Sequence, residues 1–115
     1  MRIISFSKMW DKLKQSEFTT FRFPRKDRDL KVGEQVQVYY KNRTPQREKL
    51  GEAVITLIEP RYLSEITNLE AKIDGFADYM DMMRWLTSIY PDRILLTRQP
   101  MNKLTLKWLT SNEGG

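Results

Sequence analysis

The chain has 115 residues, 40% hydrophobic and 30% charged, which suits one globular domain and is too short for two. It contains neither cysteine nor histidine, and this excludes Cys/His zinc sites, thiol nucleophiles and Ser-His-Asp triads. The formal net charge is +5, a modest excess that favours contact with a polyanion without requiring it.

The sequence does not predict a membrane protein. It has no run of 18 or more apolar residues, so we expect no membrane span and no membrane partner. The apolar stretch before Lys8 is too short for a signal peptide, and the lack of cysteine fits a reducing compartment. We therefore expect a cytoplasmic protein.

The basic residues are concentrated in the first half of the chain. Residues 1–62 carry 14 basic and 8 acidic side chains, whereas residues 63–115 carry 6 and 7. This distribution predicts one basic face directed toward a polyanion. The alternative interpretation is a well-solvated surface without a ligand.

The first elements in chain order are a strand, a short helix and a second strand. Residues 2–6 are mostly apolar and indicate a strand, and Ser7 is a good N-cap for a short helix over 8–15. Residues 17–23 alternate, with β-branched and aromatic side chains that favour a strand, and Pro24 ends it.

Two further strands follow, separated by a basic loop. Gly33 is available for the positive φ of a turn, and the alternation over 36–40 predicts a strand after it. Residues 41–49 form a basic loop. Residues 51–58 are apolar on both faces, which is typical of a central strand, and Pro60 predicts a break before Tyr62.

The second half of the chain predicts helices. Ile66, Leu69 and Ile73 share one helical face. The N-terminus of this helix is either a capping box over 67–70 or a cap one turn earlier at Ser64.

An amphipathic helix over 76–90, stopped by Pro91, and a closing strand over 104–108 complete the order. We expect an α+β fold: a partial β-barrel of about five to six strands, with three helices covering its openings. The single domain spans 1–110, and 111–115 form a disordered tail.

Four short motifs occur in an order typical of one family. Residues 15–22 resemble a "GxKxxTxR" strand, 31–36 a "xxGDxV" turn, 74–76 an "EGF" step before a helix, and 88–91 a helix end in Tyr-Pro. Over residues 3–109 the chain thus resembles the ASCH domain family of the PUA-like superfamily. The resemblance implies a PUA-like barrel and an RNA-binding module.

Some members of this superfamily are hydrolases, and one branch resembles this chain in length and deacylates N4-acetylcytidine with a lysine, a threonine and a glutamate. Here Thr20 matches the threonine and Asp74 the glutamate, but Glu17 stands where the lysine would be and Gln15 replaces the glycine. This exchange of a cation for an anion undermines that mechanism, so whether the chain is an enzyme stays open.

Glu17 and Asp74 allow two interpretations. They either form a carboxylate pair in one cleft, able to hold Mg²⁺, or Glu17 faces solvent and Asp74 is the N-cap of the helix that begins near Phe76. We favour the second, and expect no cofactor and no resident metal.

Arg22 lies mid-strand on the face of Thr20. It is either paired with a carboxylate such as Asp74 or directed at a phosphate or base edge. Basic loops interleaved with aromatic residues suit single-stranded RNA, although solvated loops around core aromatics are the alternative. The candidate RNA-binding residues are Thr19, Arg22, Arg25, Lys26, Arg28, Lys31, Lys41 and Arg43.

These observations predict a non-catalytic domain that holds single-stranded or structured RNA in a basic cleft between residues 19–22 and 74–76. The first alternative is a hydrolase or nuclease acting on a nucleoside or RNA through Thr20, Arg22, Glu17 and Asp74. The second is a protein-interaction subunit that uses its Met-rich helix. We expect RNA or a nucleotide as partner, no DNA specificity, and a monomer or weak dimer.

Overall fold

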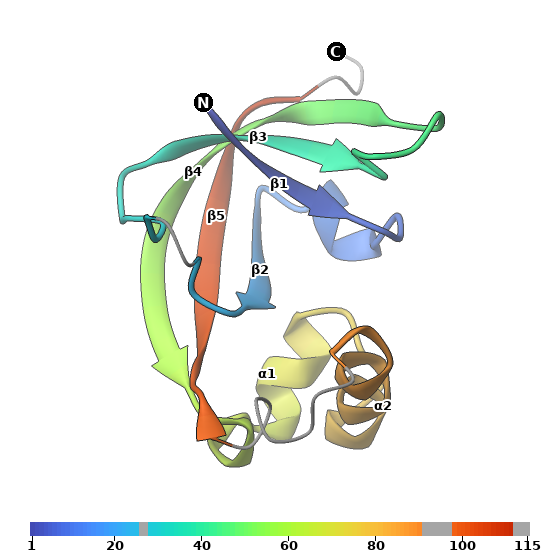
Figure 1. The fold of residues 1–115 in the computed structure, drawn as a ribbon, viewed down its shortest axis with the longest axis vertical. Coiled ribbons are helices and arrows are strands. Elements are labelled where there is room, and N and C mark those ends of the chain that lie inside the picture. The colour runs from blue at the N-terminus through green and yellow to red at the C-terminus, as the bar shows by residue number, and fades with distance from the viewer. Residues whose placement is uncertain (26–27, 91–97, 112–115) are drawn as a thin grey trace.

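The computed structural model describes residues 1–25, 28–90 and 98–111. They form an α+β fold with a curled, five-stranded half-barrel sheet and two α-helices (Figure 1). The elements are β1 (Arg2–Phe6), a 3₁₀ helix (Asp11–Lys14), β2 (Glu17–Arg22), β3 (Gln35–Tyr40), β4 (Glu48–Arg61), a 3₁₀ turn (Leu63–Glu65), α1 (Asn68–Ile73), α2 (Tyr79–Ile89) and β5 (Met101–Ser111).

The sheet has the strand order β1-β3-β4-β5-β2. Only the β1–β3 pair is parallel among the described strands, and the other pairs are antiparallel. The 14-residue β4 pairs with β3 in its first half and with β5 along most of its length. Register shifts along β4 mark bulges, which bend a strand and increase its twist, so the sheet curls into a half-barrel.

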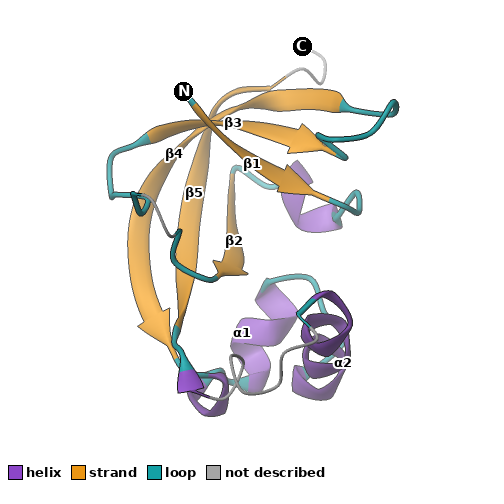
Figure 2. Cartoon of the chain, viewed as in Figure 1, coloured by secondary structure: helices purple, strands orange, loops and turns teal. Residues whose placement is uncertain are grey.

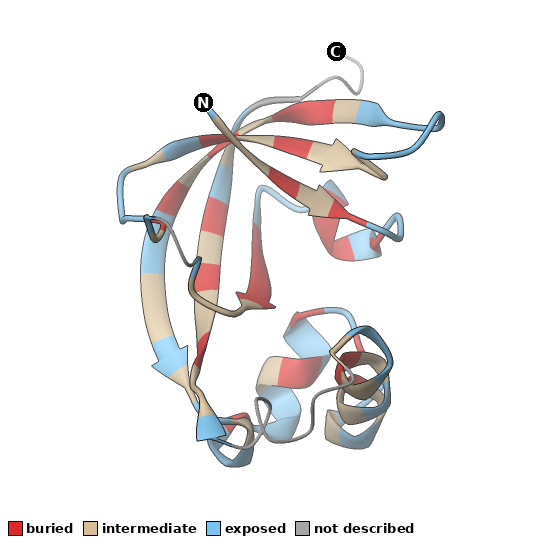
Figure 3. Ribbon diagram, in the orientation of Figure 1, coloured by how far each residue is buried: buried red, intermediate tan, exposed pale blue. Residues whose placement is uncertain are grey.

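The concave face of the sheet carries the core. Fully buried aliphatic side chains come from β1, β3, β4 and β5, and α2 adds Met82 and Leu86. Figure 3 shows the buried positions as bands across the strands and on parts of both helices. Figure 2 shows α1 and α2 together at one end of the molecule, beyond the end of β2.

Several local predictions are confirmed. The structure places the first strand at the predicted bounds 2–6, gives Gly33 a φ of 90°, and forms the capping box in which Thr67 accepts from the Glu70 amide. Residues 17–22 form β2, with the central strand as β4.

Other predictions need correction. The helix expected over 8–15 is reduced to one 3₁₀ turn, because Trp10 adopts extended backbone angles and packs its ring against Phe76 and Trp85. The strand expected over 51–58 is longer, Glu48–Arg61, and includes Pro60, whereas the break expected before Tyr62 is confirmed. Pro60 pairs with Asn102 of β5 at a point where β3 no longer lies beside β4, so it occupies an edge position, where a strand tolerates proline.

The predicted N-cap role of Asp74 is also wrong, because this residue ends α1. The amide of Gly75 donates to the Lys72 carbonyl and that of Phe76 to the Ala71 carbonyl, which is a Schellman arrangement with glycine at positive φ. Helix α2 then begins at Tyr79, where the Asp78 side chain accepts from the Asp81 amide. Pro91 and the tail after Ser111 lie outside the described residues.

Side chains connect the edge strand β1 to β2 and to the segment that follows β2. The Arg22 guanidinium donates from Nη2 to the Ser5 carbonyl at 2.7 Å, and that of Arg25 donates to the Ile3 carbonyl at 2.7 Å. These bonds lie across the open side of the half-barrel. None of the helices in the described ranges combines the length and apolar character that crossing a membrane requires.

Candidate ligand-binding cleft

A cleft of about 1040 Å³ lies between β1, the end of β2, the loop after β3, and α2. Its charges are strongly unbalanced, because among the described residues that line it the only acidic one is Asp74. The basic lining residues are Arg2, Lys12, Arg22, Arg25, Lys41 and Arg43.

The first polar group of the cleft is a buried triad. The Thr19 hydroxyl donates to Asp74 Oδ1 at 2.7 Å, and Lys12 Nζ lies 3.2 Å from the same oxygen. The Lys12 and Asp74 side chains are each only 6% exposed. An ion pair enclosed to this degree is screened little by salt and is sensitive to the loss of either partner.

Three separate elements position this triad. Asp74 is presented by the end of α1, and Thr19 by β2. Lys12 belongs to the 3₁₀ turn, which is fixed to β5 because the Trp108 indole N–H donates to the Leu13 carbonyl at 3.0 Å. The Lys12 ammonium also lies 5.3 Å from the ring centroids of both Phe6 and Trp10, a cation–π arrangement.

Burial brings both members of the ion pair closer to neutrality. Desolvation lowers the pKa of Lys12, and the Asp74 carboxylate opposes that shift. Desolvation raises the pKa of Asp74, and Lys12 and the Thr19 hydroxyl oppose it. A lysine and a carboxyl shifted in these directions are suited to accepting and donating protons.

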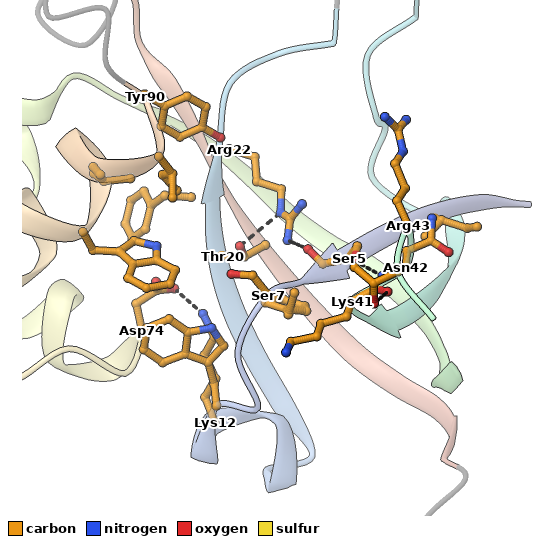
Figure 4. A pocket seen from close by; sticks show the side chains of 18 of the residues that line it. Ser5, Ser7, Lys12, Thr20, Arg22, Lys41, Asn42, Arg43, Asp74 and Tyr90 are labelled. Atoms are coloured by element: carbon orange, nitrogen blue, oxygen red, sulfur yellow. Dashed lines mark hydrogen bonds and ion pairs between the residues drawn. The ribbon is translucent and has the colours of Figure 1, made fainter. Parts of the chain in front are cut away.

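Arg22 forms the second polar group, across the cleft from Asp74 (Figure 4). Its Nε donates to Thr20 Oγ1 at 3.2 Å and its Nη2 to the Ser5 carbonyl, while the guanidinium carbon lies 4.9 Å from the Phe6 ring centroid. Desolvation lowers the pKa of Arg22 to about 10, against the opposing effect of Tyr90, so the side chain stays charged at neutral pH.

The loop after β3 closes the cleft on the side of β1. Lys41 has a left-handed φ of 48°, and its amide donates to the Phe6 carbonyl at 2.8 Å. The Asn42 amide donates to Ser5 Oγ at 3.1 Å. Figure 4 shows the Lys41 side chain extending into the cleft past Ser7, whereas Arg43 points away from Asp74.

Aromatic rings form the opposite wall. Trp10 packs edge-on against Phe76, with 5.0 Å between ring centroids, and against Trp85 at 5.4 Å. Gly75 permits this contact, because a Cβ at that position would lie 3.0 Å from the Trp10 ring. Tyr90 also lines the cleft, and Figure 4 shows its hydroxyl directed toward the Arg22 side.

The predicted site residues are only partly brought together. Asp74 and Thr20 line the cleft, and Thr19 lies directly behind it as a partner of Asp74. Glu17 is exposed at the start of β2, opposite Lys107, and is not among the described residues that line the cleft. The carboxylate pair of Glu17 with Asp74 is therefore not formed.

The same division applies to the predicted basic residues. Arg22, Arg25, Lys41 and Arg43 line the cleft. Of the described positions, Arg28 and Lys31 are exposed and lie outside it, and Lys26 falls outside the described residues. The direct Arg22–Asp74 pair considered from the sequence is absent among the described ion pairs, because Asp74 pairs with Lys12.

The sequence interpretation missed Lys12. In the expected surface helix this lysine occupies an ordinary polar position between Asp11 and Leu13. No local pattern marks it as buried, because its burial follows from the packing of Trp10 and of the 3₁₀ turn against β5. Within the described ranges, no cluster of three or more acidic side chains is arranged to hold a metal ion.

Comparisons of the chain with protein-family models, with curated proteins and with solved structures find no match. The geometry of the cleft therefore carries the functional argument.

Proposed function

We propose that this protein is an ASCH-type, PUA-like domain that binds RNA in the cleft between β1, the end of β2 and α2. The observation that carries the proposal is the charge of the lining: six basic side chains and, among the described lining residues, one acidic side chain that is already paired with Lys12. A concave surface with this excess attracts phosphates.

The aromatic wall supports RNA over a simple inorganic anion. Trp10, Trp85 and Tyr90 line the cleft beside the cations, and rings next to cations suit unpaired bases, which stack while their phosphates are neutralised. Sequence-specific recognition of RNA mostly uses such unstacked bases, so we favour single-stranded segments or loops over duplex RNA.

The test is binding of fluorescently labelled single-stranded RNA, a hairpin of the same loop sequence, and the matching DNA, followed by anisotropy over a salt series. We expect affinity to fall as salt rises, with a logarithmic slope of about −0.7 per phosphate contact on a single strand. Lys41→Gln with Arg43→Gln removes two cleft cations and should make the slope shallower.

Lys72→Gln is the matched control, because Lys72 is exposed on α1 and is not among the lining residues. An unchanged affinity and slope in the double variant, or equal effects in the double variant and the control, would contradict binding in this cleft. RNA and DNA binding with equal affinity would mean that the 2′-hydroxyl is not read.

The Lys12–Asp74–Thr19 triad favours hydrolysis as a second candidate function. The family resemblance implies a lysine, a threonine and a carboxylate for N4-acetylcytidine deacylation. Lys12 supplies a lysine beside Asp74, although Glu17 occupies the matching motif position. The threonine that contacts Asp74 is Thr19, next to the Thr20 that the motif matches. In such a reaction the lysine or carboxylate activates water for attack on the acyl carbon, the C–N bond breaks, and the leaving amine takes a proton.

This candidate predicts release of cytidine and acetate from N4-acetylcytidine, measured by mass spectrometry. Asp74→Asn should abolish the release, whereas Glu17→Gln should leave it unchanged because Glu17 is exposed outside the cleft. No product from pure wild-type protein, with RNA cleavage tested in parallel, would remove the hydrolase candidate and leave the binding proposal standing.

A further inference from the structure

Arg22 is a partly buried cation with unused hydrogen-bond donors. A guanidinium has five N–H donors. In Arg22, Nε is directed to Thr20 and Nη2 to the Ser5 carbonyl, while Nη1 has no acceptor among the described residues. No acidic side chain of the described residues forms an ion pair with it.

Two other partly buried arginines are paired with acidic side chains. Arg2 pairs with Glu34 at 2.6 Å, and Arg61 pairs with Glu59 and Glu70. Desolvation has the largest effect on the pKa of Arg22 and lowers it, whereas Tyr90 and Asp74 act in the opposite direction. The ion pair of Asp74, however, is formed with Lys12 and not with Arg22. A desolvated cation without an anion is unfavourable, and an incoming anion relieves this.

Two further donors line the same cleft as Arg22 and come from different segments. Ser5 Oγ accepts from the Asn42 amide, so its own hydroxyl proton is available to a ligand. Lys41 lines the cleft from the loop after β3, and Figure 4 shows its side chain extending past Ser7. Its ammonium lies 5.4 Å from the Tyr40 ring centroid. The Arg22 guanidinium is held in place by Thr20, Ser5 and the Phe6 ring, so it is pre-organised for binding.

We infer that Arg22, Ser5 and Lys41 form a phosphate subsite, and that the ligand of the cleft is a nucleotide, free or within an RNA chain, in preference to a nucleoside. Donors that line one cleft from three segments suit a tetrahedral phosphate, whose oxygens point in different directions, better than a planar carboxylate. The inference rests on the proposed function only for the rest of the ligand, which the aromatic wall would hold.

The experiment compares ligands that differ only in phosphate. Isothermal titration calorimetry measures the binding of four nucleosides, their 5′- and 3′-monophosphates, inorganic phosphate and a short single-stranded RNA. We expect at least one monophosphate to bind about 10- to 100-fold more tightly than its nucleoside, as charge-assisted hydrogen bonds allow.

Variants locate this preference. Arg22→Gln should remove the preference while nucleoside affinity stays as in the wild type, a split that misfolding would not produce. Arg22→Lys keeps a charge but not the fork of donors, so it should keep part of the preference, and Lys41→Gln should reduce it. Lys72→Gln is the control, and thermal unfolding by circular dichroism checks each variant.

The outcomes show whether the phosphate subsite, the RNA-binding proposal or both are wrong. If RNA binds but monophosphates bind no better than nucleosides, or if the folded Arg22 variants keep the full preference, the phosphate subsite is wrong and RNA binding stands. If monophosphates bind through Arg22 but RNA does not bind, the subsite stands and the ligand is a free nucleotide. If neither binds, both ideas fail, and this result needs only the wild-type protein.

Discussion

The buried Lys12–Asp74 pair allows a direct test of the cleft. Replacing Lys12 with Met keeps most of the side-chain volume but removes the ammonium, and it leaves the Asp74 carboxylate with the Thr19 hydroxyl as its remaining partner. The variant also loses the cation–π contacts with Phe6 and Trp10. The substitution therefore leaves the buried Asp74 carboxylate without its cationic partner.

The expected loss of stability is large for a single substitution. Removing one partner of a buried ion pair costs about 3–5 kcal/mol, and the two side chains here are each 6% exposed, which places this pair in the buried class. A domain of this size has a total stability of about 5–15 kcal/mol. We expect Lys12→Met to lower the free energy of unfolding by about 3 kcal/mol at pH 7, since Asp74 can partly escape by taking up a proton.

The pH dependence of stability shows whether Asp74 takes up a proton in the variant. The folded-state pKa of Asp74 is raised above its ordinary value of 3.8, and loss of Lys12 raises it further. Within the window between 3.8 and the raised value, the folded variant binds more protons than the unfolded chain, so its stability increases as the pH falls. The deficit of Lys12→Met relative to wild type should therefore shrink toward acid pH.

The assay is urea denaturation of wild type, Lys12→Met, Asp74→Asn and the double variant at several pH values. In this cycle we expect a coupling free energy of about 1–3 kcal/mol between the two positions. The reasoning is refuted if Lys12→Met stays within about 0.5 kcal/mol of wild type across the pH range, the behaviour of an ordinary surface substitution, or if the two single effects simply add.

Two further predictions concern the frame of the cleft. The hydrogen bond from Arg2 lowers the pKa of Glu34 to about 2. Glu34→Gln should therefore lower the free energy of unfolding by about 1–3 kcal/mol above pH 4.5, and this difference should vanish as the pH falls through about 2. Urea denaturation measures the difference, and a value independent of pH would contradict the prediction. Gly75→Ala should lower the denaturation midpoint more than Gly33→Ala. Both glycines have positive φ, but only at Gly75 would a Cβ meet the Trp10 ring, at 3.0 Å. Equal effects of the two substitutions would show that Trp10 moves freely.

Local features of the fold are predictable from the sequence because their causes are local. The alternation over 17–22, the positive φ of Gly33 and the capping box at Thr67 depend on neighbouring residues, and each occurs as predicted. The prediction of a short helix over 8–15 is wrong because the structure there depends on a distant contact. Trp10 gains more by packing against α2 than by continuing a helical turn, and local pattern carries no information on that contact.

The cleft shows the same limit. The spacing of the motif predicts Glu17 as a site residue, but Glu17 lies outside the cleft. The same spacing does not predict Lys12, which lines it. The Lys12–Asp74 ion pair joins residues far apart in the sequence, so only the packing of the 3₁₀ turn on β5 reveals it. An arginine amid threonine and phenylalanine on a strand is unusual, so the sequence alone marks Arg22 as a candidate. Its lack of an acidic partner among the described residues depends on the fold and cannot be predicted from neighbouring residues.

The open side of the half-barrel has a consequence for self-association. Unpaired backbone groups on an edge strand are a template on which a strand of another molecule can add. On β1 the carbonyls of Ile3 and Ser5 are instead occupied by Arg25 and Arg22, which act as caps against such intermolecular pairing. Arg22, which we propose to bind phosphate, thus also occupies a carbonyl of an edge strand. We therefore expect substitutions at this position to change ligand binding and edge-strand pairing together.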